Sequence, residues 1–171
     1  MNELQAILDR IKSNGGEFWS REDGNIYSPI GSSTLDTLFV IGETSLATVD
    51  NPVIAKAVEF ILSYQTSNGA FRYLETSAKL PCLTARILGA LGRLSVKDER
   101  LEKSYQHLIK LQCEDGGWRC NTVKRGNSPL TDASNPGTTL YLLDAFRFRE
   151  NNDSVREQLT EGLIFYSSTG M

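Results

Sequence analysis

The chain has 171 residues, of which 40% are hydrophobic and 23% are charged, and its formal net charge at pH 7 is −3. This length is enough for one domain with a sizeable core, and the acidic balance argues against general nucleic-acid binding, which needs a basic face. No apolar stretch reaches the ~20 residues that span a bilayer, and residues 1–5 lack the basic and apolar regions of a signal peptide. We therefore expect a cytoplasmic protein whose three cysteines are free thiols.

Helical periodicity dominates the chain, and alternation typical of strands is nearly absent. The apolar pattern predicts helices at about residues 3–13, 32–46, 52–65, 82–94, 97–112, 137–149 and 153–167. Asn51-Pro52 and Asn135-Pro136 precede two of them. Asparagine caps a helix well and proline suits its first position, so the third helix is expected to begin at Pro52. The predicted fold class is all-α.

A short pattern of glutamine, glycine and an aromatic residue recurs along the chain. Its members are Gln112, Gly116 and Trp118, then Gln65, Gly69 and Phe71, and a weaker copy with Lys12, Gly16 and Phe18. The aromatic residues Phe18, Phe71 and Trp118 are 53 and 47 residues apart, a spacing that indicates a helical repeat.

Each repeat has the same order: an amphipathic helix, the turn with its aromatic residue, a polar loop, a proline and a more apolar helix. The predicted repeats are about 1–46, 47–94 and 95–150, followed by a final outer helix in 151–171, all within one domain of residues 1–171. The apolar helices are expected to form an inner layer that the amphipathic helices cover from outside.

The spacing Gln-x-x-x-Gly-x-aromatic resembles the QW motif of the squalene cyclase and protein prenyltransferase superfamily. The resemblance implies an α/α toroid of helical hairpins, in which the glutamine caps helix ends and the aromatic residue packs beneath the next helix. Complete rings in the family have more repeats, so about three and a half repeats would form a partial ring.

The terpene cyclases of this superfamily use an Asp-x-Asp-Asp-Thr-Ala motif as general acid. Thr84-Ala85 could match the end of that motif, but Leu80-Pro81-Cys82-Leu83 precedes it and contains no acid. Enzymatic activity therefore stays open. One hypothesis is a prenyltransferase-like or cyclase-like protein that binds an isoprenoid or another apolar ligand in a cavity between inner helices. The alternative is a non-catalytic helical-repeat scaffold for protein partners.

Protein prenyltransferases bind zinc through Asp, Cys and His, and this resemblance implies a possible zinc site at Cys82, Cys120 and Asp132. The cysteine spacing matches no standard zinc pattern, so the alternative is that these cysteines are free or simply packed. His107 lies mid-helix among polar neighbours and is expected at the surface.

The apolar helices also align at Thr34-Leu35-Asp36, Thr84-Ala85-Arg86 and Thr139-Leu140-Tyr141. Charged residues are rarely buried alone, so Asp36 is expected to pair with Arg86, with Tyr141 beside them. This group is either a structural ion pair or a ligand-binding cluster. Arg119, Lys124 and Arg125 in the third loop either bind a diphosphate or are solvated.

Three repeats leave apolar helices at both ends of the array, and such arrays need capping or association. The last helix ends with Leu163-Ile164-Phe165-Tyr166, which is too apolar for a polar cap. The sequence therefore predicts a homodimer, or a different partner subunit, that completes the ring.

Overall fold

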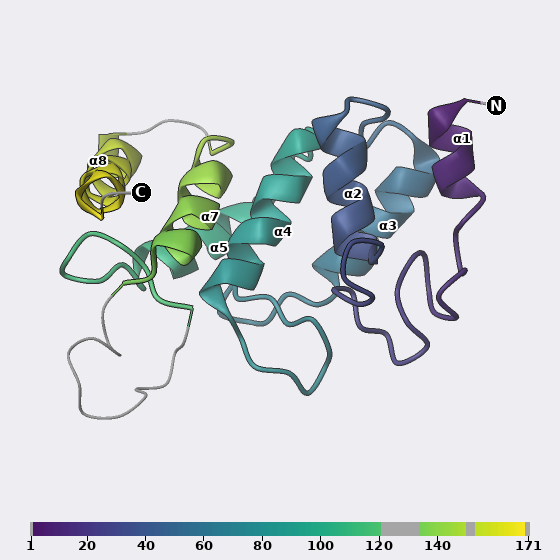
Figure 1. Ribbon diagram of the computed structural model, residues 1–171, viewed down its shortest axis with the longest axis horizontal. Helices are drawn as coiled ribbons and strands as arrows, with labels where there is room; N and C mark the ends of the chain where they lie inside the picture. Colours follow the sequence, from purple (N-terminus) through teal and green to yellow (C-terminus); the bar gives the residue numbers. More distant parts are fainter. Residues whose placement is uncertain (1, 121–133, 150–152, 170–171) are drawn as a thin grey trace. The chain divides into compact units, whose positions relative to one another are not determined.

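The computed structural model describes residues 2–120, 134–149 and 153–169. They form α1 (Glu3–Leu8), α2 (Thr34–Glu43), α3 (Pro52–Leu62), α4 (Pro81–Arg93), α5 (Glu99–Ile109), α7 (Pro136–Phe146) and α8 (Asp153–Ser168) (Figure 1). No strand occurs among these residues, so the predicted all-α class is confirmed. None of the described helices has the length and apolar character needed to cross a bilayer.

The chain divides into two compact units. Unit 1 comprises residues 1–65, 72–78 and 90–98, and unit 2 comprises residues 66–71, 79–89 and 99–171. Helix α4 contributes residues to both units. The toroid arrangement and the single domain therefore stay predictions.

Asparagine side chains cap the starts of α3 and α7, as expected. Asn51 accepts hydrogen bonds from the backbone N–H groups of Val53 and Ile54, at 2.9 and 3.3 Å, and Asn135 accepts one from Thr138 at 2.9 Å. A proline follows each cap at the start of the helix, where a missing N–H costs nothing.

The first helix is shorter than predicted. It ends at Leu8 instead of continuing to residue 13, and turns follow it. Lys12 has a φ of 66°, a left-handed conformation that cannot continue a right-handed helix.

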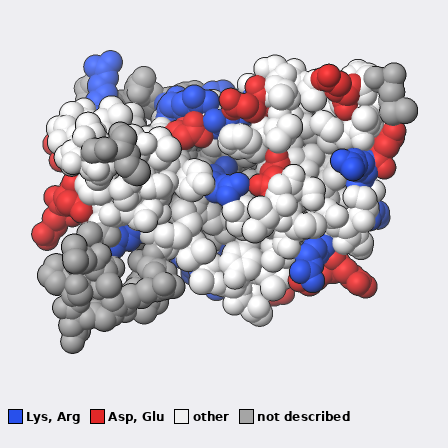
Figure 2. Space-filling view, in the orientation of Figure 1, with Lys and Arg blue, Asp and Glu red and all other residues white. Residues whose placement is uncertain are grey.

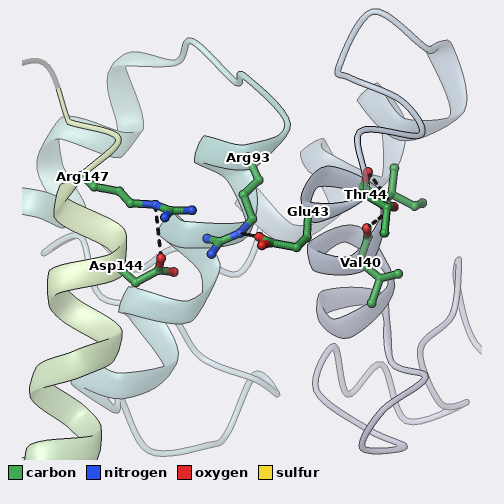
Figure 3. A network of polar contacts seen from close by, with 7 residues as sticks. Val40, Glu43, Thr44, Arg93, Asp144 and Arg147 are labelled. Carbon is green, nitrogen blue, oxygen red and sulfur yellow. Dashed lines mark hydrogen bonds and ion pairs between the residues drawn. The ribbon is translucent and has the colours of Figure 1, made fainter.

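The core of unit 1 forms where α2 packs against α3. Its fully or nearly buried side chains include Trp19, Ile26, Leu35, Leu38, Ile41, Ile54, Val58, Ile61 and Leu62. The helix pattern predicted most of these positions. A Cβ atom on Gly42 would lie 2.7 Å from the Cβ of Arg93, so the absence of a side chain at Gly42 permits this close approach. Arg93 also pairs with Glu43 (Figure 3). Its guanidinium carbon lies 4.3 Å from the ring centre of Phe39.

The core of unit 2 surrounds Trp118, which is completely buried. Its ring centre lies 6.0 Å from that of Phe146, and Phe146 lies 5.5 Å from Tyr105. The indole N–H of Trp118 donates a hydrogen bond of 2.8 Å to the carbonyl of Leu108. A Cβ on Gly162 would lie 2.9 Å from the indole, so α8 packs closely over Trp118.

One hydrogen bond recurs at each aromatic turn. The backbone N–H groups of Trp19, Phe71 and Trp118 donate to the hydroxyl oxygens of Thr34, Thr84 and Thr139 at 3.2, 3.0 and 3.0 Å. All three threonines are fully buried, so these N–H groups have no access to water there. Each bond fixes an aromatic turn to the first turn of an apolar helix.

These bonds correct the expected register of the first repeat. Trp19, rather than Phe18, occupies the place of Phe71 and Trp118, and its indole N–H donates to Ile7 as that of Trp118 does to Leu108. Phe18 has a φ of 51° and contacts Phe60 instead, with ring centres 5.4 Å apart.

The glycines of the later two turns are required by both conformation and space. Gly69 and Gly116 have φ values of 89° and 83°, which favour glycine. A Cβ on Gly69 would collide with the carbonyl of Lys103, and one on Gly116 would lie 2.7 Å from that of Glu161. Gln112 stabilises its turn by donating from Nε2 to the carbonyl of Gly116 at 2.9 Å.

Replacement of Thr84 by valine keeps the side-chain shape and removes the acceptor of the Phe71 N–H. The orphaned buried donor should lower the free energy of unfolding by about 1–3 kcal/mol, measured by urea denaturation. The exposed Thr76→Val variant is the control and should change stability by less than about 0.5 kcal/mol. Equal stability of the two variants would contradict the role assigned to this bond.

Candidate functional site

Asp36 is a buried carboxylate at the start of α2, with 9% of its surface exposed. Its Oδ2 accepts hydrogen bonds from the N–H of Gly31 at 2.7 Å and the hydroxyl of Ser33 at 2.8 Å. In return, Ser33 Oγ accepts from the N–H of Asp36 at 3.1 Å. Ser33 and Asp36 therefore form a reciprocal cap, and the positive end of the helix dipole favours the carboxylate there.

Asp36 also lines a half-open cavity of about 350 Å³ that lies entirely within unit 1. We name it the unit 1 cavity. Its wall is formed by α1, the first aromatic turn, the segment before α2 and the first turns of α2. The lining residues are Ile7, Arg10, Ser13, Asn14, Trp19, Gly31, Ser32, Asp36, Thr37 and Val40.

Hydrogen bonds hold the wall of this cavity in place. Asn14 donates from Nδ2 to the carbonyls of Trp19 and Ser32, at 2.7 and 3.1 Å. The indole of Trp19 donates to the carbonyl of Ile7 at 3.1 Å, which connects the aromatic turn to α1. The cavity thus has fixed polar and apolar walls and one side chain of each charge, Arg10 and Asp36.

A second candidate site lies in unit 2, on α4 and α7. The guanidinium carbon of Arg86 lies 5.4 Å from the ring centre of Tyr141, within the range of a cation–π interaction. Tyr141 and its neighbour Leu140 are exposed, at 43% and 47%. We name this surface the Arg86–Tyr141 face.

The structure thus brings together two of the three residues of the predicted cluster, Arg86 and Tyr141. Asp36 belongs to unit 1 and Arg86 to unit 2, so their expected pairing stays a prediction. Arg119 is partly buried beside Cys120 in unit 2. Lys124 and Arg125 lie outside the described residues, so diphosphate binding by this loop stays a prediction.

The cysteines differ from the expectation of three free thiols. Cys82 and Cys120 form a disulfide with Cα atoms 5.5 Å apart, and Cys113 is free. Cys82 lies in the first turn of α4, one helical turn before Arg86, so the disulfide borders the Arg86–Tyr141 face. The separation of 38 residues explains why sequence spacing did not indicate the pair.

The zinc site stays a prediction. Cysteine binds zinc as a thiolate, so Cys82 and Cys120 could act as ligands only after reduction. The third predicted ligand, Asp132, lies outside the described residues. Within the described ranges, no group of three His, Cys, Asp or Glu side chains could hold a metal ion.

His107 is half-buried on α5 rather than fully at the surface. Burial lowers its pKa below the usual value, and the charges of Lys79 and Lys110 lower it further. Its imidazole is therefore favoured in the neutral form at pH 7.

Acidic and basic side chains are mixed on the face of the molecule that Figure 2 shows. Figure 2 shows acidic and basic side chains interspersed on one face, without an unbroken area of one sign among the coloured residues. At the end of α7, Asp144 and the C-cap residue Arg147 form such a local pair, with 3.2 Å between carboxylate and guanidinium atoms (Figure 3).

Sequence reasoning found Asp36 but missed the rest of the unit 1 cavity, notably Arg10, Asn14 and Ser32. These residues surround it only because α1 ends early and the chain turns back before Trp19. The spacing Ser33-x-x-Asp36 before an apolar run was a usable signal for the helix cap, although not for the cavity.

No protein-family model matches this sequence, and neither does any curated protein. The resemblance to the squalene cyclase and prenyltransferase superfamily therefore rests on the motif residues alone.

Asp115 should make stability depend on pH. Burial alone would raise its pKa, but hydrogen bonds from the Ser134 hydroxyl and from the N–H groups of Gly117 and Ser134 outweigh burial and lower it. A lowered folded-state pKa stabilises the fold above the unfolded-state pKa of about 3.9, and this stability is lost as pH falls through the folded-state pKa.

Thermal unfolding of Asp115→Ala should therefore occur at a lower temperature than that of the wild type at pH 7. The difference should shrink as the pH falls below about 4. The neighbouring exposed Glu114→Ala variant is the control and should match the wild type at pH 7. A constant difference between Asp115→Ala and wild type from pH 7 to pH 2 would contradict the assignment.

Proposed function

We propose that the protein is a helical-repeat protein of the prenyltransferase and terpene-cyclase type that binds a small amphiphilic molecule without transforming it. The unit 1 cavity is the observation that carries this proposal. Its volume of about 350 Å³ falls within the range of small-molecule sites, roughly 300–1,000 Å³.

The lining of the cavity favours a ligand with one apolar and one polar part. Ile7, Trp19 and Val40 offer apolar surface for a short hydrocarbon chain, while Asn14 and Thr37 offer hydrogen-bonding groups. The bonds from Asn14 and Trp19 hold the wall in place before a ligand arrives, which reduces the entropy cost of binding.

The charges of the lining favour a neutral polar head. Arg10 contributes one positive charge and Asp36 one negative charge. A diphosphate carries several negative charges and needs several cations, and the Asp36 carboxylate would repel it. A short-chain isoprenoid alcohol has both an apolar chain and a neutral polar head, so we assign this class of ligand to the cavity.

Binding without reaction agrees with the sequence around Thr84-Ala85, the segment that could match the end of the general-acid motif of terpene cyclases. Thr84 accepts the hydrogen bond from Phe71 and is fully buried, and Ala85 is also fully buried. Both residues serve packing, and no carboxylic acid precedes them between Leu80 and Leu83.

Intrinsic tryptophan fluorescence can test this proposal, because Trp19 lines the cavity. Geraniol should change the emission in a saturable way, and geranyl diphosphate should bind more weakly. Val40→Phe adds bulk inside the lining and should weaken binding by roughly tenfold or more. Lys56→Phe places the same ring at an exposed position of α3 outside the lining and should bind as the wild type does.

Tighter binding of geranyl diphosphate than of geraniol would contradict the neutral-head assignment. Equal binding by Val40→Phe and Lys56→Phe would show that the ligand does not occupy the unit 1 cavity.

A second function, as a scaffold that associates with another subunit, is favoured by the exposed apolar residues of α8. Leu163 and Ile164 are 55% and 64% exposed on this last helix. We propose that a second copy of the chain covers them, because a helical array needs a cap or a partner at an apolar end.

Sedimentation analysis should then give a dimer of about 38 kDa, twice the chain mass of 19.0 kDa. The double variant Leu163→Glu with Ile164→Glu should sediment as a monomer, because it would place charges in the apolar contact. Ser168→Glu, at an exposed position of the same helix, should remain a dimer. A monomeric wild type at micromolar concentration would contradict this second proposal.

A further inference from the structure

The Cys82–Cys120 disulfide occupies an environment suited to thiol chemistry. Both cysteines are partly exposed, so a small reagent can reach them. Cys82 lies in the first turn of α4, a helix of 13 residues, where the helix dipole is positive. Arg86 lies one turn further along α4, on the same side of the helix.

These features distinguish the two sulfur atoms. The helix end and the Arg86 guanidinium both favour a negative charge on the sulfur of Cys82. The sulfur that leaves most easily in disulfide exchange is the one whose thiolate is best stabilised. Arg119 adjoins Cys120, so each sulfur has a neighbouring cation, but only Cys82 lies at a helix start. Cys82 is therefore the better leaving group, and Cys120 is the sulfur that is attacked.

The position of Arg86 is itself fixed by the fold. Its guanidinium lies over the ring of Tyr141, 5.4 Å from the ring centre, and this contact restricts the side chain. The start of α4 is fixed by the bond from the Phe71 N–H to Thr84, which lies between Cys82 and Arg86. The cation is thus held on the residue one helical turn after Cys82.

We propose that Cys82 and Cys120 form a reversible thiol–disulfide exchange site for low-molecular-weight thiols of the glutathione class. The thiolate of the small molecule attacks Sγ of Cys120, and the disulfide bond breaks to release the Cys82 thiolate. A second small thiol then attacks the mixed disulfide at the sulfur of the small molecule and releases Cys120. The protein disulfide is reduced to two thiols, and two small thiols are oxidised to one disulfide.

Mass spectrometry tests this proposal directly by counting the adducts on each protein after alkylation, where an adduct is either an alkyl group or a glutathione on a cysteine. Protein equilibrated with oxidised glutathione should carry one adduct, at Cys113, and protein equilibrated with excess reduced glutathione should carry three. The matched control Cys113→Ser should carry no adduct after oxidised glutathione and two adducts after excess reduced glutathione. Cys82→Ser should carry two adducts in both conditions.

The rate of reduction tests the role of Arg86. Arg86→Gln should slow reduction by glutathione by roughly threefold or more, since the leaving thiolate loses its cation, and Arg86→Lys should restore much of the rate. Arg147→Gln removes the exposed arginine that follows α7 and should leave the rate unchanged.

Three adducts on the wild type after oxidised glutathione would overturn the proposal, because no disulfide would have formed. One adduct after excess reduced glutathione would overturn it as well, because the bridge would be purely structural. Unchanged reduction of Arg86→Gln would overturn the assignment of Cys82 as the leaving sulfur.

Discussion

A hydrogen bond from a buried backbone N–H to a threonine hydroxyl underlies each aromatic turn of this protein. The donors belong to Trp19, Phe71 and Trp118, and a threonine in the first turn of an apolar helix accepts each bond. A buried N–H without an acceptor costs ~1–3 kcal/mol, so the turn cannot separate from its helix without penalty. The bond therefore sets the register between a loop and the helix that follows it.

The positions of both candidate sites depend on this register. Asp36, Arg86 and Tyr141 each follow the accepting threonine by two residues. Because the bond fixes the position of the threonine, it also fixes the position of each of these residues on its helix. In unit 1 it places Trp19 in the wall of the cavity. In unit 2 it fixes the start of α4, where Cys82 forms its disulfide and Arg86 contacts Tyr141.

The local features of the fold could be predicted because they depend on local chemistry. Periodic apolar residues marked the helices, and Asn51 and Asn135 marked two of their starts. The choice of Phe18 for the first repeat was wrong because two aromatic residues are adjacent there. Only the bond to Thr34 identifies Trp19 as the equivalent residue.

Contacts between distant segments could not be predicted in the same way. The pairing of Cys82 with Cys120 depends on how a loop returns to the start of α4, which helical periodicity does not describe. The unit 1 cavity depends on the early end of α1 and on the turns that follow it, which include the left-handed conformation at Lys12. Both the disulfide pairing and the cavity therefore depend on the conformation of a turn or loop, which a helix pattern does not predict.

Amide hydrogen exchange measured by NMR tests the central role of the threonine bonds most directly. The amides of Trp19, Phe71 and Trp118 should exchange only when their units unfold, at rates like those of the best-protected helix amides. In Thr84→Val, the amide of Phe71 should lose this protection while those of Trp19 and Trp118 keep it. Exchange of the three wild-type amides as fast as that of the exposed Ser67 amide would contradict the account.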